Sequence, residues 1–296
     1  MLDTVIIGGS SAGLSAALIL GRSLRNVMVI DDGKPCNRFS HASHGFLTRD
    51  GVVPSELLRV AREQLERYSS IRFKAATAMR IEKTGGTFAV TSSDGMVARA
   101  RTVLLATGLN DEMPAIEGIE GLWGERVFHC PYCDGYEVRG KKLVVHGADS
   151  NSLHQALLLR NLTPNVTLCA GWDLSATERE RVEHAGIRIV EQPIVAIDGT
   201  SNPFMAVRLA DGTMLSCDAL FIRPQTTHRT PFARDLNCAI DARDVVQVDL
   251  RGRTSIAGVY AAGDIASPMR SVAVAVAQGA SAAYGINSDL VEMDFP

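Results

Sequence analysis

The sequence has few aromatic residues, few cysteines and no excess of charge of one sign. Aromatic residues make up 5% of its 296 residues, six residues are cysteines, and the formal net charge is −3. Nucleic-acid binding usually rests on clustered Lys and Arg, but here basic and acidic residues are scattered along the chain. The sequence therefore predicts no nucleic-acid partner.

Long apolar runs are also missing. Stretches such as Val272 to Ala277 are far shorter than the roughly 18 to 20 residues that span a bilayer, so we expect no membrane insertion. The first residues read as a strand without the segments of a signal peptide, which favours a cytoplasmic protein. Four cysteines stand alone and are expected to be small buried hydrophobes: Cys36, Cys169, Cys217 and Cys238.

The chain reads as two Rossmann-type α/β units. Residues 3–31 and 141–169 each follow the order strand, turn, helix, strand. A later strand ends in Gly263 and is followed by an Ala-rich helix expected over Val272 to Gly285. The pattern predicts a three-layer domain formed by residues 1–113 plus 243–296, with a second, nucleotide-binding-like domain inserted at 114–242.

A dinucleotide-binding fingerprint opens the first unit. Gly8-Gly-Ser-Ser-Ala-Gly13 lies between a strand and a helix, and Asp31 ends the next strand. Glycine permits a tight turn and a close approach to pyrophosphate, and the acidic residue accepts ribose hydroxyls. A turn without a ligand is the alternative. The fingerprint alone does not separate flavin from nicotinamide enzymes, because both classes use it.

Cys130-Pro-Tyr-Cys133 has the spacing of a redox-active pair, and Asp134 follows it directly. Two intervening residues allow a small disulfide ring, and a following helix would lower the pKa of a thiolate at its N-terminus. One alternative is half of a zinc site, with His129 adjacent, but a second pair of ligands at close spacing is lacking. The other alternative is a pair of inert structural cysteines.

These motifs, in this order and together with Ala106-Thr-Gly108 and Gly258 to Asp264, resemble the small two-domain thioredoxin reductases over nearly the whole chain. The resemblance implies FAD, no metal and a homodimer. It implies that Cys133 lies next to the flavin, that Cys130 meets the substrate, and that Asp134 is the acid/base. The implied FAD-binding residues are Gly8, Ser10, Gly13, Asp31, Gly108, Gly263, Asp264, Arg270 and Val272.

The second unit departs from a reductase that uses NADPH. His146 and Ala148 stand at the positions of the first two glycines of its fingerprint. Thioredoxin reductases carry a His-Arg-Arg cluster for the 2′-phosphate after the next strand, where this chain reads Leu168-Cys-Ala-Gly-Trp-Asp-Leu174. NADP is therefore doubtful as a cofactor, although binding through an altered turn stays open.

The favoured hypothesis is an FAD-dependent dithiol oxidase that forms disulfides with O2 as electron acceptor. It resembles the thioredoxin reductase-like oxidases that close the disulfides of gliotoxin and holomycin, and the segment His41 to Gly51 is similar to that branch. The substrate would be a small dithiol or a protein thiol. His41 and His44 are either bases near the disulfide or ordinary polar loop residues.

Three alternatives remain. The first is an NAD(P)H-dependent disulfide reductase of the thioredoxin type. The second is a flavin-binding redox sensor whose cysteines regulate rather than turn over. A membrane-linked NADH dehydrogenase fits the two Rossmann units but leaves Cys130 and Cys133 without a role.

Overall fold

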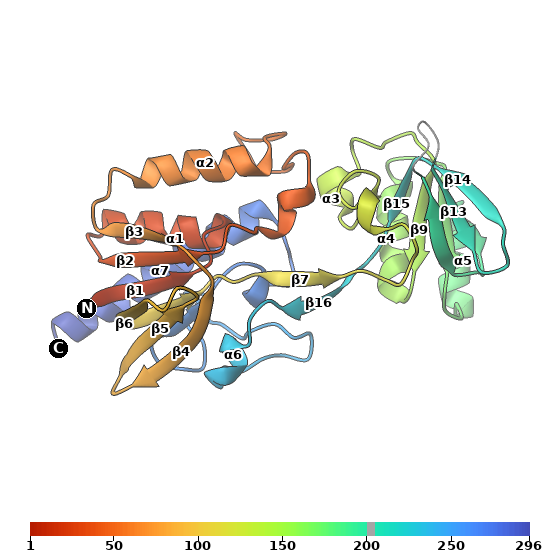
Figure 1. Cartoon of the computed structure of the whole chain (residues 1–296). Coiled ribbons are helices and arrows are strands. Elements are labelled where there is room, and N and C mark those ends of the chain that lie inside the picture. Colours follow the sequence, from red (N-terminus) through yellow and green to blue (C-terminus); the bar gives the residue numbers. More distant parts are fainter. Residues whose placement is uncertain (200–204) are drawn as a thin grey trace. The chain divides into compact units, whose positions relative to one another are not determined.

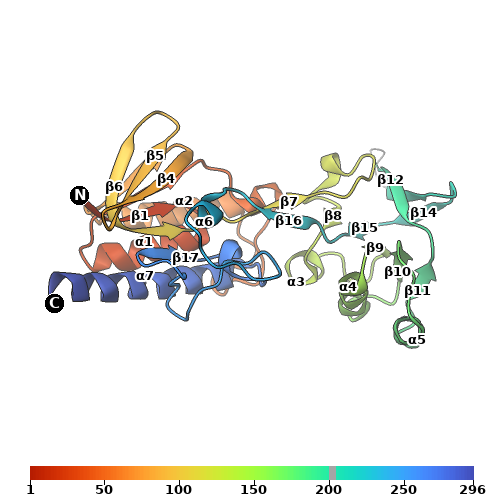
Figure 2. The same cartoon turned by 90° about the horizontal axis from the view of Figure 1, so that it is seen from below.

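The computed structural model describes residues 1–199 and 205–296 and divides into two compact units. The first unit comprises Met1–Arg38, Phe46–Asn110 and Thr227–Pro296, and the second comprises Phe39–Gly45 and Asp111–Thr226. Each contains a sheet with parallel strands together with helices (Figures 1 and 2). The predicted α/β fold class is confirmed.

The chain passes between the units through two short strands. Strand β7 (Leu109–Glu112) leads out of the first unit, β16 (Gln225–His228) leads back, and the two pair as a two-stranded sheet. The sequence predicts that the chain returns to the first unit at residue 243, whereas the first unit resumes at Thr227. The difference arises because helix α6 (Phe232–Asp235) buries Phe232 in the core of the first unit.

The first unit is built on a seven-stranded sheet in the order β3-β2-β1-β6-β5-β4, with β17 also paired to β6. Strands β1, β2, β3, β6 and β17 run parallel, whereas β4, β5 and β6 form an antiparallel meander. The strands are β1 (Leu2–Ile7), β2 (Val27–Asp31), β3 (Ile71–Ala75), β4 (Ala78–Thr84), β5 (Thr87–Ser92), β6 (Val97–Leu105) and β17 (Val259–Ala261).

Apolar side chains cover both faces of this sheet. Successive residues of a strand point to opposite faces, so Val5 and Ile7 of β1 join one core cluster while Ile6 joins the other. Helices α1 (Ser11–Arg22), α2 (Pro54–Leu65) and α7 (Val272–Asp294) contribute to the cluster that contains Ile6. The first unit therefore has the layered arrangement that positions a nucleotide at the strand ends.

Helices α1 and α7 approach each other through Gly279. A Cβ atom at this position would lie 2.1 Å from the carbonyl oxygen of Ala12. Helix α7 also runs nine residues beyond Gly285, its predicted end. That prediction was wrong because Gly285 does not stop the helix: it makes room for the carbonyl oxygen of Arg251, 2.4 Å from where a Cβ would lie.

The second unit has a five-stranded parallel sheet in the order β11-β10-β9-β15-β8 and a separate antiparallel sheet, β12-β13-β14. Its strands are β8 (Val127–Phe128), β9 (Leu143–Gly147), β10 (Val166–Ala170), β11 (Arg188–Val190), β12 (Ile194–Asp198), β13 (Met205–Leu209), β14 (Met214–Cys217) and β15 (Ala219–Phe221). Its helices are α3 (Pro131–Asp134), α4 (Ser150–Arg160) and α5 (Ala176–His184). Short 3-10 turns lie at Cys36–Phe39, Glu120–Leu122 and Asp264–Ala266.

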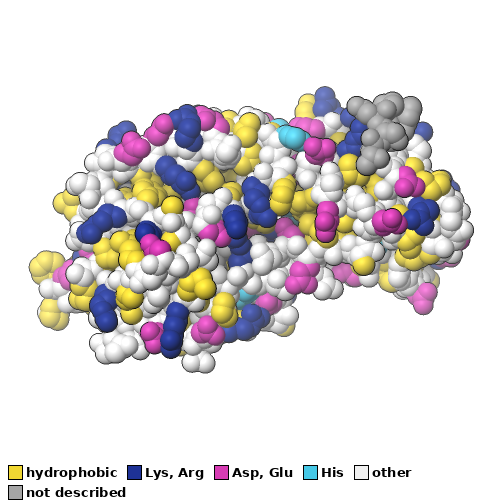
Figure 3. Space-filling view, in the orientation of Figure 1, with side chains coloured by type: hydrophobic (Ala, Val, Ile, Leu, Met, Phe, Trp, Pro, Cys, Tyr) yellow, Lys and Arg dark blue, Asp and Glu magenta, His cyan; other side chains and the backbone are white. Residues whose placement is uncertain are grey.

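Charges of both signs are mixed on the surface. On the face drawn in Figure 3, the described Lys and Arg side chains lie among Asp and Glu side chains rather than in one continuous basic area. Among the described helices, none is both long enough and apolar enough to cross a membrane.

The close approach at Gly279 makes Gly279→Ala a test of the α1–α7 packing. Alanine favours a helix by about 1 kcal/mol over glycine, but the clash with backbone at Ala12 cannot be relieved by a side-chain rotation. We expect a net loss of about 1–3 kcal/mol in the free energy of unfolding, measured by urea denaturation. Ala277→Ser, at an exposed position of the same helix, should change it by less than about 0.5 kcal/mol. Equal stability of both variants would contradict this packing.

Candidate active site

The turn after β1 requires glycine at two positions. Gly8 has φ +104°, and a Cβ there would lie 2.2 Å from the carbonyl oxygen of Ala106, the residue that follows β6. A Cβ at Gly13 would lie 1.9 Å from the carbonyl oxygen of Gly8. Both contacts are with backbone, so no side-chain movement relieves them. The turn is therefore fixed close to the N-terminus of α1.

The first turn of α1 offers donors to an anion. Ser10, the N-cap residue, is extended and its side chain makes no capping hydrogen bond, and the first turn carries no acidic residue. Backbone N–H groups at such a terminus are suited to phosphate. The Gly9 N–H donates to Asp31 Oδ1 at 2.9 Å, and Arg62 donates to Asp31 Oδ2 at 2.6 Å. Each carboxylate oxygen has a second lone pair for a ribose hydroxyl.

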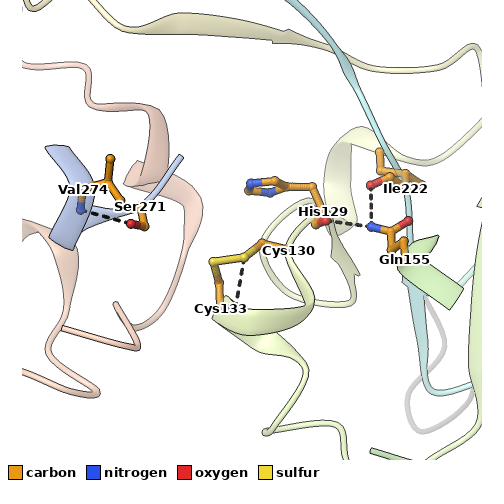
Figure 4. Close-up of a disulfide and its surroundings, with 7 residues drawn as sticks. All are labelled: His129, Cys130, Cys133, Gln155, Ile222, Ser271 and Val274. Atoms are coloured by element: carbon orange, nitrogen blue, oxygen red, sulfur yellow. Dashed lines mark hydrogen bonds between the residues drawn. A yellow bond between two sulfur atoms is a disulfide. The ribbon is translucent and has the colours of Figure 1, made fainter. Parts of the chain in front are cut away.

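The later predicted residues gather at the start of α7. A Cβ at Gly263 would lie 3.1 Å from the Cβ of Ala12, which places Gly263 beside the first turn of α1. Arg270 donates from Nε to Asp264 Oδ2 at 3.2 Å. Val272 is the first residue of α7, whose N-cap Ser271 accepts from the Val274 N–H (Figure 4). Gly108 has φ +67°, and the space beside its Cα is open.

Two neighbours of this group were not foreseen. Gln278 accepts from the Gly263 N–H through Oε1 at 2.9 Å, and its only signal in the sequence is a polar residue within an Ala-rich helix. Arg270 also donates to the Sγ of Cys36 at 2.9 Å. The expectation that Cys36 is a buried hydrophobe was wrong, because it is half-buried and bonded to a cation.

Apart from Gly108, the structure brings the predicted cofactor residues together around the N-termini of α1 and α7. The turn at Gly8 and Gly13 and the backbone N–H groups at the start of α1 fit the pyrophosphate of a dinucleotide. Asp31 fits its ribose. The first unit can therefore hold FAD with the residues that the fingerprint predicts.

Cys130 and Cys133 form a disulfide with a Cα–Cα distance of 5.2 Å (Figure 4). Cys130 is the N-cap of α3 and Pro131 is its first residue, where a missing N–H costs nothing. The Cys133 N–H lies 3.1 Å from Cys130 Sγ and donates to it. Sulfurs bonded to each other are not thiolate ligands. Across residues 1–199 and 205–296, no group of three or more His, Cys, Asp or Glu residues could hold a metal.

Gln155 of α4 connects the disulfide loop to the sheet. Its Nε2 donates to the carbonyl oxygen of His129 at 2.7 Å and to that of Ile222 at 3.3 Å (Figure 4). These residues directly follow β8 and β15, and the Gln155 side chain is buried. Gln155 thus fixes the residue that precedes Cys130, a role that sequence reasoning missed.

Asp134 is half-buried at the end of α3, and its pKa is raised to about 6. Burial is the largest cause, the carboxylate of Glu137 also raises this pKa, and His44 lowers it. His44 Nε2 lies 3.6 Å from Glu137 Oε1. Of the two histidines considered as bases, His44 therefore reaches the surroundings of Asp134. His41 pairs with Glu125 at 3.8 Å, with 75% of its side chain exposed.

The remaining lone cysteines are buried, as the sequence predicts. Burial raises the pKa of Cys169 and of Cys217 to about 12 and also raises that of Cys238. Thiols with a raised pKa are poor nucleophiles. Redox chemistry in the second unit is therefore expected at Cys130 and Cys133.

The second Rossmann-type turn is filled by side chains of the chain itself. A Cβ at Gly147 would lie 2.3 Å from Cζ3 of Trp172, so the indole ring lies against the backbone of this turn. Asp149 caps α4 and accepts from the N–H groups of Asn151 and Ser152 at 3.1 Å each. Burial raises the pKa of Asp149, but hydrogen bonds from Asn151 and Ser152, together with the positive charge of Arg223, lower it more strongly. A negative charge therefore already occupies donors that a pyrophosphate would need.

Replacing Gln155 tests its connection to the sheet. In Gln155→Leu the carbonyl groups of His129 and Ile222 lose a buried donor, which costs about 1–3 kcal/mol. We expect the free energy of unfolding to fall by about this amount in urea denaturation. His154→Gln, on the exposed side of the same helix, is the control and should match the wild type. A fully stable Gln155→Leu would show that these hydrogen bonds are not needed.

Comparisons with known proteins give the family. The pyridine nucleotide-disulphide oxidoreductase model matches residues 2–279. Thioredoxin reductase sirT of Leptosphaeria maculans is 31% identical, with 99% of this chain and 96% of sirT covered. Among solved structures, an oxidoreductase from Agrobacterium tumefaciens is 35% identical with a TM-score of 0.92, covering 98% of each chain. The structure of HlmI is 33% identical with a TM-score of 0.94, covering 99% of this chain and 93% of HlmI.

These matches span nearly the whole chain, including both fingerprints and the cysteine pair. They confirm the thioredoxin reductase-like resemblance and the enzyme class that the motifs predict. The chain belongs to the pyridine nucleotide-disulphide oxidoreductase family and is an FAD-dependent, thioredoxin reductase-like disulfide oxidoreductase.

Proposed function

We propose that this protein is a dithiol oxidase, which closes a disulfide in a dithiol substrate and transfers the electrons to O2 rather than exchanging them with NADPH. The observation that carries the proposal is the contact of Trp172 with Gly147 in the second unit. A ring packed on the turn blocks the close approach of a dinucleotide to the backbone, which glycine otherwise permits. The cytoplasmic location and the homodimer are part of the same proposal.

The charges near the turn of Gly147 also favour an enzyme that does not use NADPH. The 2′-phosphate of NADPH calls for Arg or Lys, but residues 168–174 contain neither. Asp149 adds a negative charge at the start of α4. Like charges repel, so this carboxylate disfavours a pyrophosphate at the same helix start, although Arg223 acts on Asp149 as a nearby positive charge.

The residues of the second unit perform the thiol chemistry. One substrate thiolate attacks Cys130 Sγ, the Cys130–Cys133 bond breaks, and Cys133 leaves as a thiolate. The second substrate thiol attacks the mixed disulfide, so the substrate disulfide forms and Cys130 is released. Two electrons then lie on the cysteine pair, and two protons have left the substrate. FAD, when bound, supplies an acceptor for this electron pair, and O2 takes up two electrons and two protons as hydrogen peroxide.

A disulfide reductase driven by NAD(P)H is the second candidate. It is favoured by the names of relatives such as sirT and the thioredoxin reductase of Helicobacter pylori, which is 27% identical over 98% of this chain. In that case electrons would flow toward Cys130 and Cys133, and Trp172 would have to leave Gly147. A redox sensor is the third candidate and predicts no turnover.

Anaerobic titration of the yellow holoprotein separates the candidates. We expect dithiothreitol to bleach the flavin band and NADPH to leave it unchanged, because only the dithiol reaches a competent site. Readmitted air should restore the band and release one peroxide per dithiol. Cys130→Ser and Cys133→Ser should each abolish bleaching by dithiol, whereas Cys238→Ser, at a buried cysteine remote in sequence, should retain it.

Rapid bleaching by NADPH would contradict the oxidase proposal and favour the reductase. Thermal unfolding gives an independent check, because a nucleotide present at about 100 times its Kd stabilises a protein by about 2.7 kcal/mol. We expect no such stabilisation by NADPH or NADH. Bleaching without turnover in air would instead favour the sensor.

A further inference from the structure

The loop that follows β2, residues 31–36, begins and ends at the nucleotide site of the first unit. Its first residue, Asp31, accepts a hydrogen bond from the glycine-rich turn after β1. Its last residue, Cys36, accepts through Sγ from Arg270 at 2.9 Å. Arg270 in turn donates to Asp264, another of the predicted cofactor residues. Both ends of this β2 loop are therefore attached to the site.

The middle of the β2 loop is a short exposed turn. Residues 32–34 are exposed, and Gly33 has φ +74° with open space beside its Cα. Asp32 accepts from the Lys34 N–H through Oδ1 at 3.2 Å, which is a bond within the turn itself. Ordering such a turn costs conformational entropy, so a group that fixes it before the cofactor arrives raises cofactor affinity.

Arg229 contacts this turn from a distant part of the chain. Its Nη1 donates to the carbonyl oxygen of Lys34 at 2.7 Å, and its Nη2 donates to Asp32 Oδ2 at 3.2 Å. The side chains of Arg229 and Asp32 are only 22% and 27% exposed. The rigid guanidinium fork of arginine suits two acceptors at once. Arg229 therefore fixes both the side chain and the backbone of the turn.

The segment that carries Arg229 is itself held in place. Arg229 directly follows β16, where the chain returns to the first unit. The side chain of His228 is 1% exposed, and its Nε2 lies 2.6 Å from the carbonyl oxygen of Asp244. Phe232 is buried in the core. Arg229 thus reaches the exposed turn from a segment that is anchored on both sides.

We propose that Arg229 is a positioning residue for FAD, which holds the turn of Asp32 and Lys34 so that Asp31 is set to meet the adenosine ribose. This role requires FAD to lie at the glycine-rich turn and at Asp31, and it is independent of whether O2 or NADPH is the partner of FAD. Because Asp32 and Lys34 follow the ribose acid directly, Arg229 acts on the adenosine half of the cofactor.

The test measures which half of FAD loses affinity. Holoprotein is titrated with ADP, which carries the adenosine half, or with FMN, which carries the flavin half. Released FAD is separated by ultrafiltration and quantified by chromatography, which gives dissociation constants for FAD, ADP and FMN. A residue that only supports the general fold would change the affinity for ADP and for FMN alike.

In Arg229→Gln we expect the dissociation constants of FAD and ADP to rise together by about tenfold, because hydrogen bonds that involve a charged group are lost on the adenosine side. The value for FMN should stay unchanged. Asp32→Asn keeps an oxygen that can accept from the Lys34 N–H but loses its charge, so its effect should be smaller. The double variant should bind FAD no more weakly than Arg229→Gln, since both changes remove the same contact.

Arg234→Gln is the matched control, because Arg234 lies in the same returning segment and also pairs with an aspartate, Asp244. It should bind FAD, ADP and FMN as the wild type does. Unchanged binding in Arg229→Gln, or a loss for FMN as large as the loss for ADP, would overturn the role of Arg229. If ADP does not displace FAD from the wild type, the placement of adenosine at Asp31 fails together with this role, while the oxidase proposal stands.

Discussion

The N-terminus of α1 is the constraint on which the first unit depends. Its N-cap Ser10 makes no side-chain capping hydrogen bond, and its first turn holds no acidic residue. The backbone N–H groups at the start of this helix therefore need an acceptor from elsewhere. The glycine contacts at Gly8, Gly13 and Gly279 bring a strand end, a turn and a second helix to this point with almost no room for a Cβ. The start of α4 has the opposite solution, because Asp149 takes its donors. Two helices in similar βαβ positions thus differ in whether the chain supplies its own anion.

Much of this arrangement could be predicted from local sequence. A glycine-rich turn between an apolar strand and an apolar helix has a single good geometry, so the first fingerprint and the order of the elements followed from residues close together in the chain. The departures at His146 and Ala148 were visible for the same reason. Local sequence does not explain a glycine that is required by a residue far away in the chain. Gly285 resembles the end of a helix, but glycine is needed there because the backbone of Arg251 lies too close for a Cβ.

Other parts of the site depend on contacts that sequence does not encode locally. Nothing near His44 in the chain indicates that residues 39–45 pack with the second unit, or that Glu137 faces the imidazole at 3.6 Å. Trp172 packs against the core of the second unit. Its significance is that the surface on which it packs is the turn of Gly147. In the sequence, the only hint of this contact is that Trp172 stands in a segment without Arg or Lys.

Gln155 gives helix α4 a structural role that does not depend on nucleotide binding. The parallel strands β8 and β15 end side by side, and the buried amide of Gln155 donates to the residue after each one. Removing α4 would take one hydrogen-bond donor from each of these carbonyl groups, and a hydrogen bond lost in a buried position costs about 1–3 kcal/mol. The helix that begins at the turn of Gly147 thus holds the loop that leads to Cys130. Because the sheet and α4 support the disulfide, the fold of the second unit can be retained whether or not its turn still binds a dinucleotide.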